Sequence, residues 1–389
     1  MQKTVQDMPA PLPVIPLAGV TATVSVFAIA QGLSYPLFTF LMQAQGMSPA
    51  MIGLSAAMTP LGLVASAPLV PVLARLVGAR GLAICCALAA AALFVLVWSL
   101  QNAFAWFALR FVIGVAINPL YVLSEVWMIS LAPSGQRGRI MGLYTAIVGA
   151  GFAAGPFSLM LVGTDGLAPF AVGVCAFLVC ALCLSAIASR LPEMGNDGEA
   201  APPTLSFLKL APALLLAVAV AAGFEQALLS LLPVYGAGYA IAEQTVAALL
   251  TVMIAGNIAL QVPLGLLAER FAARSVMIGC AAISAAGAAA LPFIIDTAMI
   301  WPVLFVVGAV SYGIYTMALI ELGARFSGQA LVAGNAAFAL MWGVGGLVGP
   351  PGAGGAMQLI GLQGLPFVLF ALCAMLVLFA LYRKRQRGA

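Results

Sequence analysis

Long apolar runs separated by short polar breaks dominate the pattern of this chain. A helix needs about 20 apolar residues to cross a bilayer. Runs such as residues 87–97 are unbroken and lack the alternation of apolar and polar positions that marks a membrane-barrel strand. The pattern therefore predicts an all-α membrane protein with about twelve spans. They lie near residues 13–41, 50–74, 80–101, 103–131, 139–162, 167–189, 208–236, 244–268, 275–295, 299–324, 328–357 and 363–382.

Composition narrows the range of functions. Hydrophobic residues make up 64% of the 389 residues and charged residues only 7%, against about 25% charged residues in a soluble domain. So few charges cannot solvate a 39.7 kDa globule, which excludes a soluble enzyme, a disordered chain and a nucleic-acid binder. The net charge of +4 does not alter this, because the position of the charges matters more than their sum.

The sequence carries no signature of metal, cofactor or disulfide chemistry. Its seven cysteines fall inside predicted spans without zinc-site spacing, and it has no histidine. Met47 and Met51 form a thioether pair of the kind that binds Cu(I), but a single pair at an outer mouth argues against copper. We expect no enzyme, no metal and no cofactor. Residues 1–13 lack the layout of a cleaved signal peptide.

Basic residues predict the topology. With twelve spans, every Lys and Arg except Arg110 falls in a tail or in a loop on one side of the membrane. Cytoplasmic loops are rich in Lys and Arg, so we expect both termini in the cytoplasm. The polar stretch 192–206 then lies in a cytoplasmic linker. We expect a six-helix bundle at 1–190, a linker at 191–207, and a second six-helix bundle with a basic tail at 208–389.

The two predicted halves resemble one another at a fixed offset of 194 residues, the distance from Gly151 to Gly345. Any single match of Gly or Ala is weak, but a Gly-xxx-Gly-Pro run recurs in register. Two equivalent halves suggest a duplicated transporter with its pathway between them. The residues that match are Leu73, Ala74, Arg80, Gly114, Tyr121, Gly151, Gly155 and Pro156, with Leu267, Ala268, Arg274, Gly308, Tyr315, Gly345, Gly349 and Pro350.

Three segments together resemble the major facilitator superfamily. Its loop motif Gly-x-Leu-Ala-Asp-Arg-x-Gly-Arg-Arg is similar to Gly265-Leu-Leu-Ala-Glu-Arg-Phe-Ala-Ala-Arg274, whereas the first copy has Arg75 in place of Asp. The span at 103–131 carries the family's Arg-xxx-Gly motif, and Gly151-Phe-Ala-Ala-Gly-Pro resembles part of a motif associated with proton antiporters. The resemblance implies twelve helices in two pseudo-symmetric six-helix bundles, transport by alternating access, and a bacterial inner membrane.

Three acidic residues lie within the predicted spans, where ionisable groups are costly and mark function by default: Glu125, Glu225 and Glu321. Glu225 lies near the midplane, where desolvation disfavours the charged form of an unpartnered acid, so we predict a proton carrier. The alternative is a protonated interhelix hydrogen-bond donor. Arg110 and Glu125 share one helix face and complete the predicted proton-coupling set.

Arg110 has two alternative roles: it binds an anion or stabilises a facing carboxylate, or it donates hydrogen bonds to backbone carbonyls of neighbouring helices. Glu125 lies nearer the cytoplasmic end, where we favour a gating salt bridge with Arg75, Arg80 or Arg139. The predicted gating residues are Arg75, Arg80, Glu269, Arg270, Arg274, Glu321 and Arg325, although the last two can pair along one helix.

Amide and aromatic side chains at helical spacing suggest a binding surface for a neutral or planar organic ligand. For the aromatic residues, packing is the alternative explanation. The predicted substrate-binding residues are Gln31, Tyr35, Asn118, Tyr121, Asn257, Gln261, Tyr312, Tyr315, Asn335 and Trp342.

We therefore expect a monomeric secondary active transporter of a small, neutral or amphipathic organic solute, coupled to protons and embedded in the lipid bilayer. The partial antiporter-like motif favours efflux. Uptake of a metabolite or vitamin is the first alternative, and a non-transporting sensor on the same scaffold is the second. An intramembrane enzyme lacks the commonest base, since the chain has no histidine.

Overall fold

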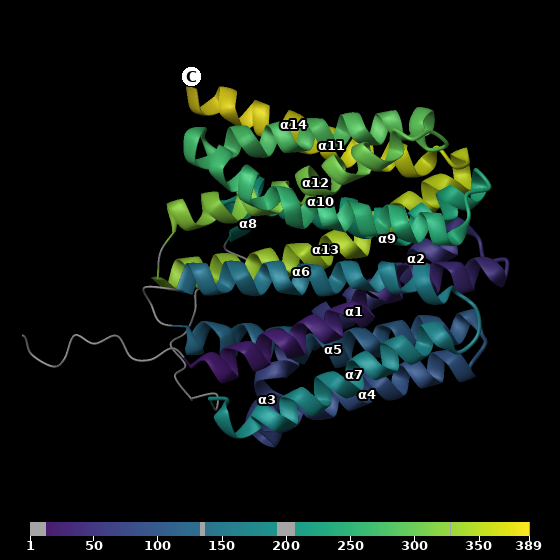
Figure 1. Ribbon diagram of the computed structural model, residues 1–389. Helices are drawn as coiled ribbons and strands as arrows, with labels where there is room; N and C mark the ends of the chain where they lie inside the picture. The colour runs from purple at the N-terminus through teal and green to yellow at the C-terminus, as the bar shows by residue number, and fades with distance from the viewer. Residues whose placement is uncertain (1–12, 133–136, 193–206, 327, 389) are drawn as a thin grey trace, which may run out of the picture.

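The computed structural model describes residues 13–132, 137–192, 207–326 and 328–388. Within these ranges the secondary structure is helical, and twelve helices are long and apolar enough to cross a membrane. They run side by side and alternate in direction (Figure 1). We call the end where α1 begins and α14 finishes the terminal end, and the opposite end the distal end.

The predicted spans are confirmed to within a few residues. The first half contains α1 (Val14–Ala44), α2 (Pro49–Ser66), η2 (Ala67–Leu69), α3 (Val70–Val77), α4 (Ala79–Ser99), α5 (Ala103–Leu131), α6 (Arg137–Val162), α7 (Ala168–Ile187) and η3 (Ala188–Arg190). The second half contains α8 (Phe207–Leu210), α9 (Pro212–Gly238), α10 (Glu243–Arg270), α11 (Ala273–Ile294), α12 (Ile300–Arg325), α13 (Gly328–Ile360) and α14 (Gly364–Gly388).

Prolines explain the two places where the helices depart from the predicted spans. The second span is not one α-helix: a 3₁₀ turn at Ala67–Leu69 interrupts it, because Pro68 and Pro71 cannot donate the backbone bonds of a continuous helix. The seventh span begins at Pro212 rather than at 208. The residue before a proline is pushed out of the α region, and Ala211 accordingly separates α8 from α9 with φ −138° and ψ 50°.

Glycines let the backbones of α2 and α5 touch. A Cβ atom on Gly62 would collide with the carbonyl oxygen of Phe111. At the repeat offset, a Cβ on Gly256 of α10 would collide with the carbonyl oxygen of Phe305 of α12. Small residues allow this close approach in membranes, and the same crossing is therefore built twice.

A second crossing is also built twice. Gly151 of α6 packs against the carbonyl oxygen of Ser25 in α1, and Gly345 of α13 packs against that of Ala219 in α9. The members of each pair differ by the same 194-residue offset that relates the sequence repeat. The glycine repeat found in the sequence thus marks equivalent helix contacts in two pseudo-symmetric bundles.

Two antiparallel crossings join the halves, α2 with α13 and α10 with α6. Gly343 packs on Val64 in the first, and Gly149 packs on Ile258 in the second. These two contacts are again equivalent at the repeat offset, since 64 corresponds to 258 and 149 to 343. These two contacts of the interface therefore follow the pseudo-symmetry of the halves.

The interface between the halves is tight at the distal end. There the Thr164 hydroxyl, two residues past the end of α6, donates to the Glu243 carboxylate of α10. The Thr39 hydroxyl of α1 donates to the carbonyl of Ser230 in α9 at 2.6 Å. Toward the terminal end, the side chains of α10 are less buried. The buried residues of α10 all lie in its distal part, between 246 and 256, and none of residues 257–270 is buried.

Candidate functional site

Glu225 lies at the midpoint of α9, equally far in sequence from Pro212 and Gly238. At 1.5 Å per residue this is about 20 Å from either end of the helix. Its neighbours Phe224 and Gln226 are buried, whereas Glu225 is half-buried. Among the described residues, nothing hydrogen-bonds its buried Oε2 atom. The centre of the molecule thus holds a carboxyl group with an unsatisfied acceptor.

Three tyrosines from three helices lie near this carboxyl group. Tyr35 of α1, Tyr121 of α5 and Tyr312 of α12 each lie within electrostatic range of Glu225. Gln31, the residue equivalent to Glu225 in the repeat, is 3% exposed and lies within hydrogen-bonding reach of Tyr35. The structure therefore gathers five residues that the sequence singled out, from both halves, around one point.

Arg110 lies behind this cluster, toward the distal end. Its side chain is 1% exposed, and its guanidinium carbon lies 4.7 Å from the ring centroid of Phe38. In the described part of the chain, neither Nε nor Nη1 has a hydrogen-bond partner. Tyr35 is within electrostatic range of both Arg110 and Glu225, so it is close to the buried cation and to the central acid.

Glu125 lies on the opposite side of the cluster, toward the terminal end of α5. Its side chain is exposed, yet it is within electrostatic range of Tyr312 and Tyr315 in the other half. Glu125 is thus an exposed carboxyl group on the side of α5 that faces the other half, nearer the terminal end than Arg110.

Four aromatic side chains of α12 and α13 form what we call the aromatic wall. Trp342 lies 5.9 Å from Tyr312 and 5.2 Å from Tyr315 between ring centroids, and Tyr315 lies 6.3 Å from Phe338. Phe338 is buried behind the other three, which are half-buried. Tyr312 faces both Tyr121 and Glu125 across the interface, so the wall borders the same region as Glu225.

The predicted amides have mixed surroundings. Asn118 Nδ2 donates to Ser66 Oγ at 3.0 Å, which joins α5 to α2 within the first half. Gln261 Nε2 donates to Asn257 Oδ1 at 2.9 Å, and Gln261 Oε1 accepts from Thr316 at 2.8 Å. These amides therefore contribute to contacts between helices of the same half. Asn335 is exposed on α13 and is not part of these hydrogen-bonded pairs.

Two of the predicted gating residues, Arg80 and Arg274, are equivalent in the repeat and have similar partners. Arg80 donates to the carbonyl of Leu191, at the end of the last helix of the first half. Arg274 Nη2 donates to the carbonyl of Ala380 at 3.2 Å, near the end of α14. Cations near helix C-termini are favourable because carbonyl groups there carry partial negative charge. Arg75 is exposed and donates to Pro71 of its own helix.

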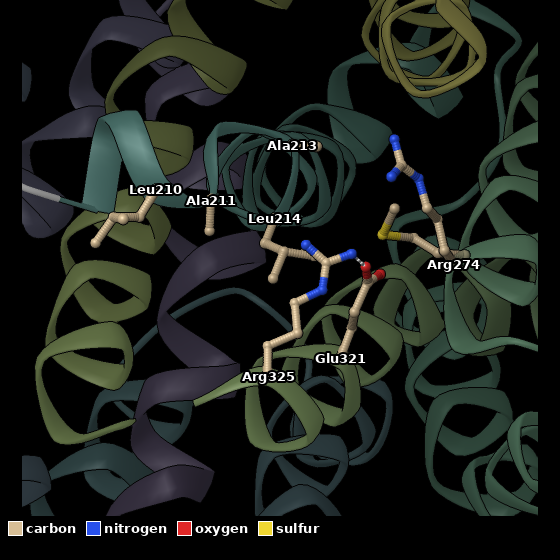
Figure 2. A pocket seen from close by; sticks show the side chains of 8 residues that line it. Leu210, Ala211, Ala213, Leu214, Arg274, Glu321 and Arg325 are labelled. Carbon is tan, nitrogen blue, oxygen red and sulfur yellow. Dashed lines mark hydrogen bonds and ion pairs between the residues drawn. The ribbon is translucent and has the colours of Figure 1, made fainter. Parts of the chain in front are cut away.

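The other gating candidates lie at the terminal end of the second half. Arg325 pairs with Glu321 along α12, and Figure 2 shows these two side chains pointing toward one another while that of Arg274 points away. Glu269 and Arg270 are exposed at the end of α10. A small pocket here is lined by Leu210, Ala211, Ala213, Leu214, Arg274, Met277, Glu321 and Arg325. Glu321 and Arg325 thus pair along one helix, which the four-residue spacing had suggested as the alternative to a gating role.

Sequence reasoning did not select Phe38 and Thr316 for the site. Phe38 lies under Arg110, and the helical spacing from Gln31 and Tyr35 was the available signal. Thr316 follows Tyr312 by four residues and hydrogen-bonds Gln261. Its place on the same helix face was visible in the sequence, but its partner depends on how α10 and α12 meet.

Comparisons with known proteins agree on the fold. The family model described as Major Facilitator Superfamily matches residues 20–242 and 214–389. An uncharacterised MFS-type transporter of Bacillus subtilis, YfkF, is 28% identical over 347 residues, which are 86% of this chain and 87% of that protein. The uncharacterised MFS-type transporter YcaD of Escherichia fergusonii is 27% identical over 249 residues, only 63% of either chain.

Solved structures are similar in fold at low sequence identity. The nucleoside transporter NupG superimposes with a TM-score of 0.77 at 12% identity, covering 96% of this chain and 99% of that one. A bacterial homologue of the human lysosomal transporter Spinster, in an inward-facing and unoccupied conformation, gives a TM-score of 0.70 at 14% identity over 96% of both chains.

Proposed function

Since the chain belongs to the major facilitator superfamily, it is a secondary transporter, and we propose that it moves a small neutral or amphipathic organic solute by proton-coupled alternating access. The observation that carries the proposal is Glu225, a carboxyl group at the centre of α9 with a buried oxygen that has no hydrogen-bond partner among the described residues. Burial of an unpaired charge is costly, so this group favours a proton or a ligand as its partner.

The proposed transport cycle uses the two crossings between the halves. Residues 1–190 and 208–389 rock against one another as two bundles, with 191–207 as the linker. The distribution of basic residues supports a cytoplasmic terminal end, in a bacterial inner membrane. On that assignment, the tight distal contacts of Thr39 and Thr164 close the outer side, and the opening faces the cytoplasm.

The proposed proton path passes from one side of the site to the other. Glu125 is exposed toward the terminal end and exchanges protons with the cytoplasm. Glu225 carries the proton at the centre. Tyr35 and Arg110 lie on the distal side, the side from which Glu225 takes up its proton in this scheme once the distal contacts open. The transporter acts as a monomer in this scheme, because both halves of one chain complete the site.

Export is the proposed direction, because residues 151–156 resemble part of an antiporter motif. In the structure, Gly151 and Gly345 make equivalent helix contacts, so these glycines serve packing in both halves. The proposed direction of transport therefore rests on the sequence resemblance. The flux experiment described next distinguishes export from import.

The test is solute movement in proteoliposomes under an imposed pH gradient. The purified chain is supplied with a mixed library of metabolites and drugs, and the lumen is analysed by mass spectrometry. We expect at least one neutral or amphipathic compound to move uphill against the proton flow. The exposed loop variant Asp296→Asn is the matched control and keeps this movement. Ligand-induced thermal stabilisation without any gradient-dependent movement would contradict the proposal and indicate a sensor.

A further inference from the structure

We propose that the cargo of the central site is an organic cation with an aromatic ring, whose charged group pairs with Glu225 and whose ring lies on the aromatic wall. This inference rests on the proposed function and specifies its substrate. It follows from the charges that face the site, from the geometry of the wall, and from what the other half has in the same positions.

The accessible charges of the site are negative. Glu125 is exposed and Glu225 is half-buried, and both lie within electrostatic range of Tyr121 and Tyr312. The cation of the cluster, Arg110, is 1% exposed and lies behind Tyr35 against Phe38. The two charged groups of the cluster that retain exposure are thus both carboxyl groups, whereas the guanidinium is almost fully buried. This arrangement attracts a cation.

The aromatic wall leaves ring surface for a ligand. Trp342 meets Tyr312 at an interplanar angle of 70° and Tyr315 at 74°. In an edge-to-face pair the edge of one ring covers one face of the other and leaves the opposite face uncovered by that contact, and all three residues remain half-buried rather than buried. Aromatic faces attract cations, and the recognition of quaternary ammonium groups relies on such surfaces. A carboxyl group within electrostatic range of Tyr312, beside partly exposed rings, is therefore a chemically matched site for an organic cation.

The first half lacks this combination. At the repeat offset, Gln31 stands in place of Glu225, Asn118 in place of Tyr312, and Val148 in place of Trp342. Neither the acid nor the wall is therefore a by-product of the duplicated helix packing, which both halves share. The cation site belongs to the second half, and the first half supplies Tyr35, Tyr121 and Glu125 opposite it.

Occupancy of the carboxyl group couples the cargo to protons. The Glu225 carboxylate either binds one proton or forms an ion pair with one monovalent cation. When the cation enters from the cytoplasm it displaces one proton from Glu225, and when a proton enters from outside it displaces the cation. The exchange is therefore one proton for one monovalent cation at this site, in the direction of cation export.

The test compares two probes of the same shape by equilibrium binding to the purified full-length chain in detergent. N-methyl-4-phenylpyridinium is permanently cationic, whereas 4-phenylpyridine is neutral at alkaline pH. We expect the cation to bind at alkaline pH and to be displaced on acidification, and the neutral probe to bind at least tenfold more weakly, roughly the value of one ion pair with the carboxylate.

Variants separate the two parts of the site. Glu225→Gln should weaken cation binding roughly tenfold to a hundredfold, and Trp342→Leu about tenfold. Asp296→Asn and Trp301→Leu are matched controls on exposed side chains, and we expect both to bind like the wild type. Glu225→Asp keeps the charge and should restore part of the affinity, which separates loss of charge from loss of folding.

Equal affinity for both probes, absence of binding by either, or unchanged cation affinity in Glu225→Gln would overturn the cation assignment. Proton-driven flux of a neutral solute that requires Glu225 would also overturn it, while leaving the proposed function intact. If the cation binds in competition with protons but no flux is measured, the cation site is supported and the transport proposal is contradicted. The two failures are thus distinguishable.

Discussion

The two halves of the molecule share their helix contacts and differ in the chemistry at their centres. Gly62 and Gly256 occupy equivalent crossings against backbone carbonyls, and the 194-residue offset relates both positions. At the centre, however, Gln31 corresponds to Glu225, and Val148 to Trp342. Where two helix backbones touch, no larger side chain fits, so the glycines are the same in both halves. Side chains at the centre are not held to one size in this way, and there the two halves differ.

The largest expected effect tests the glycine contacts that both halves share. Gly62→Ala and Gly256→Ala place a Cβ against a carbonyl oxygen of the partner helix, and each should lower stability by about 1–3 kcal/mol. The two variants should behave alike, because the crossings are equivalent. Gly265→Ala on α10 has no neighbour within 4 Å of the added atom and is the control. Melting of the detergent-solubilised protein measures all three, and a cost for only one crossing would refute the equivalence.

The next effect tests the asymmetric part. In the double variant Gln31→Glu with Glu225→Gln, the carboxyl group moves to the equivalent position of the first half. Gln31 is 3% exposed beside Tyr35, so a carboxyl group there is more deeply buried than the half-buried Glu225, and we expect uphill transport to remain absent. Radiotracer flux with the solute identified from the library measures this. Full recovery of uphill transport would mean that the halves are interchangeable.

A moderate effect is expected at the distal contact between α6 and α10. Thr164 donates to Glu243 there, whereas at the repeat offset Pro49 and Gln358 occupy the corresponding places. Thr164→Val removes one hydrogen bond worth about 0.5–1.5 kcal/mol, so the outward-open population should rise several-fold. Labelling of a cysteine introduced at Met42, which is buried near the distal end of α1, reports this opening. Gln358→Ala is the control, since Gln358 is exposed, and an equal response in both variants would count against a specific contact.

The smallest effect is expected at Arg75, where the first half carries a positive charge and the second half carries Glu269. Both side chains are exposed, and surface substitutions of this kind change stability by less than about 0.5 kcal/mol. Arg75→Gln should therefore leave the melting temperature almost unchanged. A large loss of stability would show that Arg75 holds the terminal end together in the conformation described.

Much of the fold was predictable because bilayer thickness fixes helix length and the glycine crossings leave a repeat in the sequence. The break between α2 and α3 was missed, since the apolar run continues through Pro68 and Pro71 and hydropathy alone does not register a missing backbone bond. Prolines at that spacing were the available signal.

The candidate site was predictable in part. An ionisable residue in an apolar span stands out, which is why Glu225 and Arg110 could be selected. The partners of Asn118 and Gln261 could not be predicted, because those contacts depend on how two helices lie against each other. Periodicity places a residue on a helix face and leaves open which helix that face meets.

The central claim is that one carboxyl group in the second half couples solute to protons. The most direct measurement is uphill transport and solute exchange in the same Glu225→Gln proteoliposomes, with the solute identified from the library. The variant keeps the size of the side chain but removes the acidic proton that a carboxyl group can bind and release. We predict that accumulation driven by a pH gradient is lost while exchange of labelled for unlabelled solute remains measurable. Gradient-driven accumulation at the wild-type rate in Glu225→Gln would contradict the account.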